Sequence, residues 1–346
     1  MRHDDALATI LLVSRLGGND VRPLKASEFW HLRDLIEGSA GRIDRDARGA
    51  DGELTTLPTG LNVFLRYSME NAANCELSED LADRIAGLMN RATAMAFELD
   101  RMEQTGIRTF TAFDEHYPQR WLERLGTRAP PLVHGAGAVE MLDTPGLGVV
   151  GSRDVAEAGG EVAKEVARLA ASRGLPLVSG GARGVDQLAM DAAFEAGGAV
   201  VGILAESLAR KLKQPDVRRA VYDGSTVMCT PYSPDAPFSA GNAMGRNKLI
   251  YAQAALTVVV ASDDGSGGTW SGATEALKHG YGPVAVWRGD GEGRGNGPLQ
   301  QRGALPVSSL QDIELLIDGA PASRSELPSA PGSTSEQQSL FATTPP

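Results

Sequence analysis

Cysteine is scarce in this chain of 346 residues, which contains only two, Cys75 and Cys229. They lie far apart, and neither belongs to a Cys-x-x-Cys pair. The five histidines also lack the spacing of metal ligands. We therefore expect no disulfide framework, no metal site and no cofactor, and the composition fits the reducing environment of the cytoplasm.

Long hydrophobic runs are absent as well. The apolar run from Ala6 to Val13 is far shorter than the roughly 18 apolar residues that indicate a membrane span. It has no cationic leader and no small-residue cleavage site after it. This run is predicted to form a core helix rather than a signal peptide, and we expect no membrane partner.

Positive charge is also in deficit. The chain has 33 Lys and Arg against 44 Asp and Glu, a formal net charge of −11. Proteins that hold the phosphate backbone of nucleic acids usually present a basic surface. Net charge does not locate charge, however, so any nucleic-acid-binding site in this chain must come from a local cluster of suitable residues.

Common catalytic and nucleotide motifs are missing too: there is no Walker loop, no His-Glu-x-x-His and no Gly-x-Ser-x-Gly elbow. Residues 146–151, Gly-Leu-Gly-Val-Val-Gly, match the spelling of G-x-G-x-x-G. Their glycines fall inside an apolar strand, and the next strand ends in Ser179 instead of an acidic residue. Dinucleotide binding is therefore not predicted.

The chain divides into four parts. Residues 1–105 have apolar residues at helical spacing, as in 27–36 and 81–99, and predict a helical N-terminal domain with a Gly-, Asp- and Arg-rich loop at 38–60. Residues 106–145 form a connector, and residues 146–318 form the main domain. The tail at 319–346 is rich in Pro, Ser, Thr and Gln and is predicted to be disordered.

The main domain alternates apolar, β-branched runs with amphipathic stretches. Continuous apolar strands separated by such helices are typical of a mainly parallel sheet covered on both faces. The predicted fold class is α/β, with a Rossmann-like sheet. Its expected strands are 146–150, 175–179, 199–204, 225–229, 256–261 and 283–287, and its expected helices are 159–173, 184–197, 206–220, 242–254 and 271–280.

In such a sheet, ligands bind beyond the carboxyl ends of the strands, where loops meet helix N-termini. Glycines there let the backbone approach an anion, and free N–H groups point toward it. Arginine can hold one phosphate through two parallel hydrogen bonds. We therefore predict a phosphate-binding rim made of Gly151, Ser152, Arg153, Ser179, Gly180, Arg183, Asn242, Arg246, Asn247 and Lys248.

A structural explanation competes for some of these residues. Glycines after strands often only form tight turns, so Gly180 and Gly181 taken singly require no ligand, and Asp186 can simply brace a loop. Arg153, Arg183 and Arg246 are predicted at one edge of the sheet, and together they favour a binding role.

Aromatic residues near this rim offer surfaces on which nucleobases stack. Trp270, surrounded by glycines, is the preferred candidate, followed by Tyr232, whereas core packing explains Phe238 equally well. A basic run within the helix at 206–220 is best explained as a solvated face, with a secondary path for a DNA backbone as the alternative. It comprises Arg210, Lys211, Lys213, Arg218 and Arg219.

Three motifs occur in an order and spacing that resembles the DprA/Smf family. They are Gly-Val-Val-Gly-Ser-Arg at 148–153, Ser-Gly-Gly-Ala-Arg-Gly-Val-Asp at 179–186 and Gly-Arg-Asn-Lys-Leu-Ile at 245–250. The Tyr-Pro at 117–118 and Pro-Pro-Leu at 130–132 also resemble the segment before that family's Rossmann-like domain. The likeness covers roughly residues 107–288.

This resemblance implies a homodimeric protein that binds single-stranded DNA in a positive pocket at the motif loops and helps to load the RecA recombinase in natural transformation. The chain departs from the family in its longer loop at 265–272, in its N-terminal region and in having no winged-helix segment after the sheet domain. A divergent, defence-associated (antiphage) role is therefore an alternative. The positions that match the family's pocket are Ser152, Arg153, Ser179, Gly180, Arg183, Arg246, Asn247 and Lys248.

An enzyme is the competing hypothesis. The wider superfamily of this sheet includes nucleotide phosphoribohydrolases with a Gly-Gly-x-Gly-Thr loop followed by glutamate, and residues 267–269 with Glu275 match this signature in part. Glu275 could polarise a water or a ribose with the help of Arg246. A first-turn helix residue favoured by the helix dipole explains Glu275 more simply. A nucleotide sensor that uses the same pocket without turnover is a third alternative.

Overall fold

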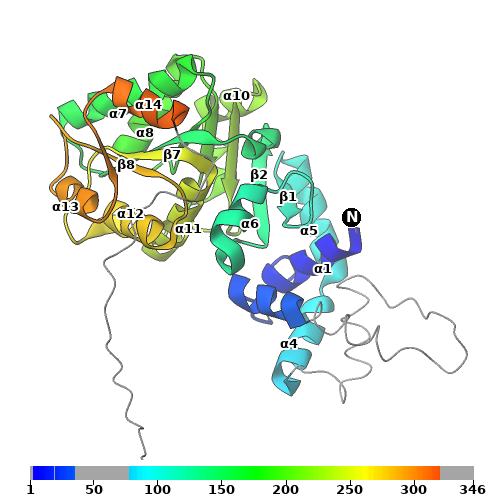
Figure 1. Ribbon diagram of the computed structural model, residues 1–346. Helices are drawn as coiled ribbons and strands as arrows, with labels where there is room; N and C mark the ends of the chain where they lie inside the picture. Colours follow the sequence, from blue (N-terminus) through cyan, green and yellow to red (C-terminus); the bar gives the residue numbers. More distant parts are fainter. Residues whose placement is uncertain (1–2, 19, 36–77, 320–346) are drawn as a thin grey trace, which may run out of the picture.

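The computed structural model of the chain describes residues 3–18, 20–35 and 78–319. In these ranges helices surround a single nine-stranded sheet with the strand order β1-β2-β6-β5-β4-β3-β7-β8-β9 (Figure 1). The α/β fold class and the helical N-terminal region are as predicted. The predicted loop at 38–60 and all but the first residue of the predicted tail lie outside the described residues.

Seven consecutive strands of the sheet run parallel. Six of them coincide with the predicted strands to within two residues at each end. Every residue of these six observed strands except Ala255 is buried between two layers of helices, which explains their continuous apolar sequences. The seven are β3 (Gly146–Val150), β4 (Leu177–Ser179), β5 (Val200–Ile203), β6 (Thr226–Thr230), β7 (Ala254–Val259), β8 (Val284–Trp287) and β9 (Leu305–Val307).

The segment expected to be a connector adds two strands at one edge. β1 (Arg108–Thr111) and β2 (Leu132–Gly137) pair antiparallel, and β2 pairs antiparallel with β6. Between them lie α6 (Gln119–Leu125) and a short 3-10 turn, η2 (Gly126–Arg128). A further 3-10 turn, η3 (Val139–Asp143), leads into β3.

Helices cover both faces of the sheet (Figure 1). One face carries α7 (Glu157–Ser172), α8 (Val185–Glu195) and α14 (Leu310–Asp318), and the other carries α6, α11 (Ala240–Gln253) and α12 (Gly267–His279). The prediction of one continuous helix over 206–220 is wrong. This segment forms α9 (Leu208–Lys211) and α10 (Pro215–Tyr222), because Pro215 is suited to the first turn of a helix and not to its interior.

The N-terminal helices are α1 (His3–Val13), a helix over residues 26–35, α4 (Glu79–Met89) and α5 (Ala92–Gln104). The run from Ala6 to Val13 lies in α1, where Ala8 and Leu12 are buried in the core as predicted. The Trp30 indole donates to the Ala129 carbonyl at 2.8 Å and ties these helices to the sheet. Over the described ranges, no helix has the length and apolar character that crossing a membrane requires.

Candidate functional site

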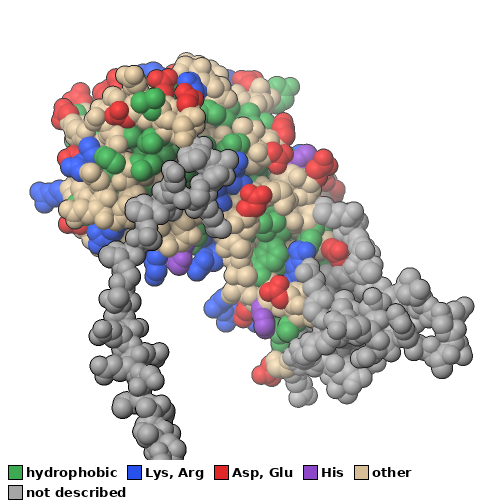
Figure 2. All heavy atoms as spheres, viewed as in Figure 1, with side chains coloured by type: hydrophobic (Ala, Val, Ile, Leu, Met, Phe, Trp, Pro, Cys, Tyr) green, Lys and Arg blue, Asp and Glu red, His purple; other side chains and the backbone are tan. Residues whose placement is uncertain are grey.

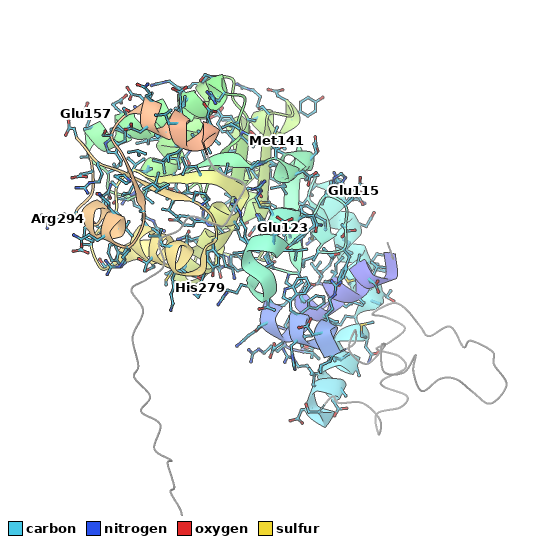
Figure 3. All side chains as sticks on the ribbon, viewed as in Figure 1. Glu115, Glu123, Met141, Glu157, His279 and Arg294 are labelled. Atoms are coloured by element: carbon cyan, nitrogen blue, oxygen red, sulfur yellow. The ribbon has the colours of Figure 1, made fainter. Side chains whose placement is uncertain are left out.

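The order of the strands changes direction beside β3. β4 pairs with one side of β3 and β7 with the other, so the loops that follow β3 and β7 diverge. Crevices at such switch points are the usual ligand sites of open α/β sheets. Glu157 at the start of α7 and Arg294 just before α13 (Asn296–Gln301) lie at this carboxyl end of the strands (Figure 3).

Two adjoining cavities open at this end of the sheet. The switch-point cavity has a volume of about 490 Å³ and is lined by the loop at 150–154, the first turns of α11 and the first turn of α12. The smaller β4 cavity, of about 290 Å³, is lined by residues 180–183, Ala205 and Glu206. Both cavities share the residues Arg153, Ala182, Phe238 and Arg246.

Arg246 lies at the floor of both cavities. Only 4% of the Arg246 surface is exposed to solvent, and the Nε and Nη1 atoms of its guanidinium have no hydrogen-bond partner. Burial lowers the pKa of this guanidinium, and the nearby Asp186 carboxylate opposes that effect. Because an arginine side chain remains charged at neutral pH, the floor of the site carries a buried positive charge with free donors.

Gly180 makes room for that guanidinium, because a Cβ at position 180 would overlap the Nη1 and Cζ atoms of Arg246. The backbone N–H of Gly180 donates to the Asp186 carboxylate at 3.2 Å, and the backbone N–H groups of Gly151 and Ala182 also favour its charged form. Burial raises the pKa of Asp186, while Arg246 and these N–H groups act against the rise. Asp186 therefore braces the two loops, as its structural explanation requires.

The loop after β3 presents Arg153 at the mouth of the site. Its guanidinium carbon lies 4.9 Å from the ring centre of Phe238. The loop is held from below, because the Ser152 N–H donates to the Ala261 carbonyl at 2.8 Å. Gly184, with φ of +85°, packs so closely on Ser152 that a Cβ there would collide with its carbonyl oxygen.

Arg183 also lies at the mouth but is already paired. Its Nη2 donates to the Asp154 carboxylate at 2.7 Å, and both side chains are largely exposed. Exposed ion pairs contribute little to stability, typically about 0–1 kcal/mol. Arg183 is thus free to exchange this partner for a phosphate.

The N-terminus of α12 closes the other side of the switch-point cavity, which residues 266–269 and Ser271 line. The N-cap residue, Ser266, makes no side-chain hydrogen bond to the helix. The first-turn N–H groups therefore have no side-chain cap and form the positive end of the helix dipole, an arrangement that attracts anions. Asn247 donates to the Gly268 carbonyl at 3.0 Å and fixes α11 against this turn.

Three predicted rim residues do not line either cavity. The Ser179 hydroxyl is fully buried and donates to the Val149 carbonyl at 2.7 Å, so it joins two strands. Asn242 lines a separate cavity next to the N-terminal helices. Lys248 follows Arg246 by two positions, which places it on another face of α11, near Glu275 and Arg128. Helical periodicity thus separates residues that are neighbours in the sequence motif.

Trp270 differs most from its prediction. The loop expected at 265–272 ends early because α12 begins at Gly267, and Trp270 lies in the first turn of that helix. The residue is 8% exposed, and the guanidinium carbon of Arg302 lies 4.7 Å from its ring centre. Its packing inside the fold leaves no free face for a base, so the interpretation of Trp270 as a stacking residue is corrected.

Glu275, the candidate of the enzyme hypothesis, lies one turn farther along α12 and outside both cavities. It accepts a hydrogen bond from the Tyr281 hydroxyl at 2.9 Å, and the Tyr281 ring stacks on His279, which Figure 3 labels at the end of α12. Glu275 and Arg246 therefore do not meet at a common substrate position. Within the described ranges, no three His, Cys, Asp or Glu side chains are grouped to hold a metal ion.

Phe238 is the residue of this site that sequence reasoning undervalued. It is 48% exposed and lines both cavities. The available signal was its position in a loop of Pro, Ser and Asp residues immediately before the helix that carries Arg246.

Charge is unevenly distributed over the described surface. In Figure 2, Lys and Arg side chains gather along the lower margin of the sheet unit, beneath α11 and α12. Lys278 and His279 are exposed in the last turn of α12, and Figure 3 labels His279 at this margin. The net charge of −11 therefore does not describe every face of the molecule.

Comparison with known proteins relates this fold to DNA-processing proteins. The chain is 28% identical over 253 residues to the DNA processing protein DprA of Streptococcus pneumoniae (strain ATCC BAA-255 / R6). The aligned region covers 70% of this chain and 88% of that protein. It is 25% identical over 215 residues to DprA of Bacillus subtilis (strain 168), covering 61% of this chain and 71% of that protein.

Two solved structures share the fold. The X-ray structure of DprA from S. pneumoniae matches with a TM-score of 0.57 and 22% identity, over 84% of this chain and 97% of that one. DprA from Helicobacter pylori, whose structure addresses its single-stranded DNA binding mode, matches with a TM-score of 0.50 and 21% identity. This match covers 62% of this chain and 97% of that one. The family model for DNA recombination-mediator protein A matches residues 108–317, and the chain accordingly belongs to this family.

Proposed function

We propose that this protein binds single-stranded DNA in the two cavities above Arg246 and acts in DNA processing during recombination. One observation carries the proposal: a guanidinium that is 4% exposed leaves its Nε and Nη1 atoms without a partner at the floor of both cavities. Leaving buried charged groups unpaired is costly. A phosphate oxygen entering either cavity would supply the missing acceptors.

The surrounding groups suit a polyanion. Arg153 and Arg183 stand at the mouth, and the first turn of α12 offers backbone N–H groups from the opposite side. These donors come from three different loops, so they can hold successive phosphates of one chain. Local chemistry thus supports DNA binding despite the acidic total charge.

The depth of the site favours a single strand. A phosphate must pass Arg153 and Phe238 to reach Arg246, whereas the phosphates of a duplex lie on a stiff helical surface whose bases are already paired. A flexible single strand can bend one phosphate into a recess and turn its bases toward the protein. The H. pylori relative, whose solved structure concerns its single-stranded DNA binding mode, supports the same choice.

Further parts of the proposal rest on membership of the family. We include a role in natural transformation, delivery of the bound strand to the RecA recombinase, assembly as a homodimer, and action in the cytoplasm. A defence-associated role is the alternative setting for the same binding activity. Sedimentation of the purified chain tests the dimer, and co-precipitation with RecA in the presence of a single strand tests the delivery.

No catalytic step belongs to this proposal. Glu275 lies outside the cavities and is hydrogen-bonded to Tyr281. A nucleotide sensor would use the same phosphate donors, and competition distinguishes it: a mononucleotide sensor is saturated by nucleoside monophosphates, whereas a strand-binding site is not.

The test is fluorescence anisotropy with a labelled oligonucleotide, single- or double-stranded, at low and moderate salt. The variant is Arg153→Ala, and the matched control is Arg168→Ala on α7, an exposed arginine that lines neither cavity. Salt should weaken binding of the single strand steeply, because phosphate contacts release counterions.

The expected result is tight, salt-sensitive binding of the single strand that Arg153→Ala weakens at least about tenfold and Arg168→Ala leaves unchanged. Binding that does not change with salt, or that both variants weaken equally, would contradict the proposed site.

A further inference from the structure

An arginine and a phenylalanine form the wall between the two cavities. Arg153 and Phe238 line both the switch-point cavity and the β4 cavity, and the Arg153 guanidinium carbon lies 4.9 Å from the Phe238 ring centre. The two cavities have a common floor in Arg246. A ligand that occupies both cavities must therefore pass over this pair.

The exposure of Phe238 has no structural explanation within the fold. Phe238 is 48% exposed even with Arg153 resting on it, and it does not belong to either buried core cluster. Among the exposed aromatic residues of the described ranges, Phe97 on α5 and Tyr222 on α10 lie away from both cavities. Phe238 is the one placed between two sets of phosphate donors.

We infer that Phe238 is a stacking platform for an unpaired nucleobase, with the phosphates on either side of that nucleotide held in the two cavities. This inference rests on the proposed function and assigns the base-contacting residue of the site. Stacking on an aromatic ring accepts any base, because every base has a π-face, and it requires that the base be unpaired.

Arg153 has two roles in this arrangement. In the free protein its guanidinium rests on Phe238, a cation–π contact of modest strength at an exposed position. When a strand arrives, the base takes the exposed ring surface and the guanidinium turns to a neighbouring phosphate. The pair is therefore predicted to select a single strand over a duplex, since a paired base cannot leave its stack without cost.

Two oligonucleotides with the same number of phosphates, one with bases and one without, distinguish base stacking from phosphate binding. A labelled thymidine oligonucleotide and an abasic strand of equal length are titrated against the wild type, Phe238→Ala, Phe238→Trp and the control Phe97→Ala. Phe97 is also an exposed phenylalanine, so its replacement matches the change in surface without touching the site. Thermal unfolding of each variant confirms that the fold is retained.

The wild type is expected to bind the thymidine strand more tightly than the abasic strand. Phe238→Ala should weaken thymidine binding about tenfold, leave abasic binding unchanged and so abolish the difference. Phe238→Trp should restore it, and Phe97→Ala should behave as the wild type.

Two outcomes overturn the inference while leaving the proposed function intact. In one, Phe238→Ala binds the thymidine strand as the wild type does. In the other, it weakens both strands equally, which would make Phe238 only a support for Arg153. A wild-type protein that binds neither strand would overturn the proposed function together with the inference.

Discussion

The guanidinium of Arg246 fills the space that a side chain at Gly180 would occupy. A Cβ at position 180 would overlap the Nη1 and Cζ atoms of Arg246, and the same glycine donates its N–H to Asp186 at 3.2 Å. The glycine motif after β4 is therefore coupled to the arginine of α11, although 66 positions separate them in the sequence. The two motifs together shape the proposed anion site.

Gly180→Ala should displace the Arg246 guanidinium from the floor of the cavities. We expect a loss of single-stranded DNA affinity of at least about tenfold, because the buried donors no longer face a bound phosphate, and a stability loss of about 1–3 kcal/mol from overpacking. Anisotropy and denaturant unfolding measure the two effects.

Gly241→Ala is the matched control for this change. Gly241 lies in the first turn of α11, and a Cβ there would meet only Ser239 Oγ, at 3.9 Å. It should keep full affinity and gain about 0.5–1 kcal/mol of stability from the lower entropy cost of alanine in a helix. If Gly180→Ala binds DNA like this control, the coupling of Gly180 to Arg246 is not functional.

Trp270→Ala should affect stability and not DNA contact. Removing this buried side chain, over which Arg302 packs, should cost about 3–5 kcal/mol in the free energy of unfolding. At a temperature where the variant remains folded, its affinity for single-stranded DNA should equal that of the wild type. A loss of affinity without a loss of stability would restore Trp270 as a stacking residue.

Glu275→Gln tests the enzyme alternative. Because Glu275 lies outside both cavities, its replacement should leave the affinity for DNA unchanged. Because Glu275 accepts a hydrogen bond from the Tyr281 hydroxyl, the replacement should cost about 1 kcal/mol in the free energy of unfolding. Chromatography of nucleoside monophosphates incubated with the wild type should detect no free base. Base release by the wild type that Glu275→Gln abolishes would establish a phosphoribohydrolase instead.

His134 should make the fold sensitive to acid. It is buried, its Nδ1 lies 2.8 Å from the Thr109 hydroxyl, and burial lowers its pKa to about 4. The unfolded chain takes up a proton near pH 6.5 and the folded chain does not. The free energy of unfolding should therefore fall as the pH drops from about 6.5 to about 4, by up to about 3 kcal/mol in total.

His134→Gln should remove this part of the pH dependence, because glutamine does not titrate. Urea unfolding at several pH values between 4 and 7.5 compares the slopes of the two proteins. Equal slopes would show that His134 does not remain neutral in the folded protein. Thr109→Val, which keeps the histidine and removes the hydroxyl, should retain the slope.

Periodicity and composition were sufficient to predict most of the sheet. Six of the seven parallel strands are buried on both faces, so their sequences are continuous apolar runs that are easily distinguished from the helices between them. The seventh, β9, is exposed at Leu305 and Pro306, lacks such a run and was not predicted. The edge strand β1 and its neighbour β2 have weaker patterns and lie in the segment expected to be a connector. Pro215 indicates the break between α9 and α10, where the prediction had a single helix.

The candidate site was predictable in outline and not in detail. Strand ends place Arg153, Arg183 and Arg246 at one edge of the sheet, and these three line the cavities. Which aromatic residue is free depends on packing between distant segments: Arg302 covers Trp270, whereas little of the fold covers Phe238. A single sequence contains no signal for such contacts.

The most direct test of the proposed binding site is to find where a bound strand touches the protein. An oligonucleotide that carries 4-thiothymidine is bound to the wild-type chain, crosslinked by light and located by mass spectrometry of the digested peptides. Crosslinks are expected in the segments 151–154, 180–183 and 238–247, which surround the two cavities. Crosslinks confined to the basic run at 210–219, with none in those three segments, would contradict the proposed binding site.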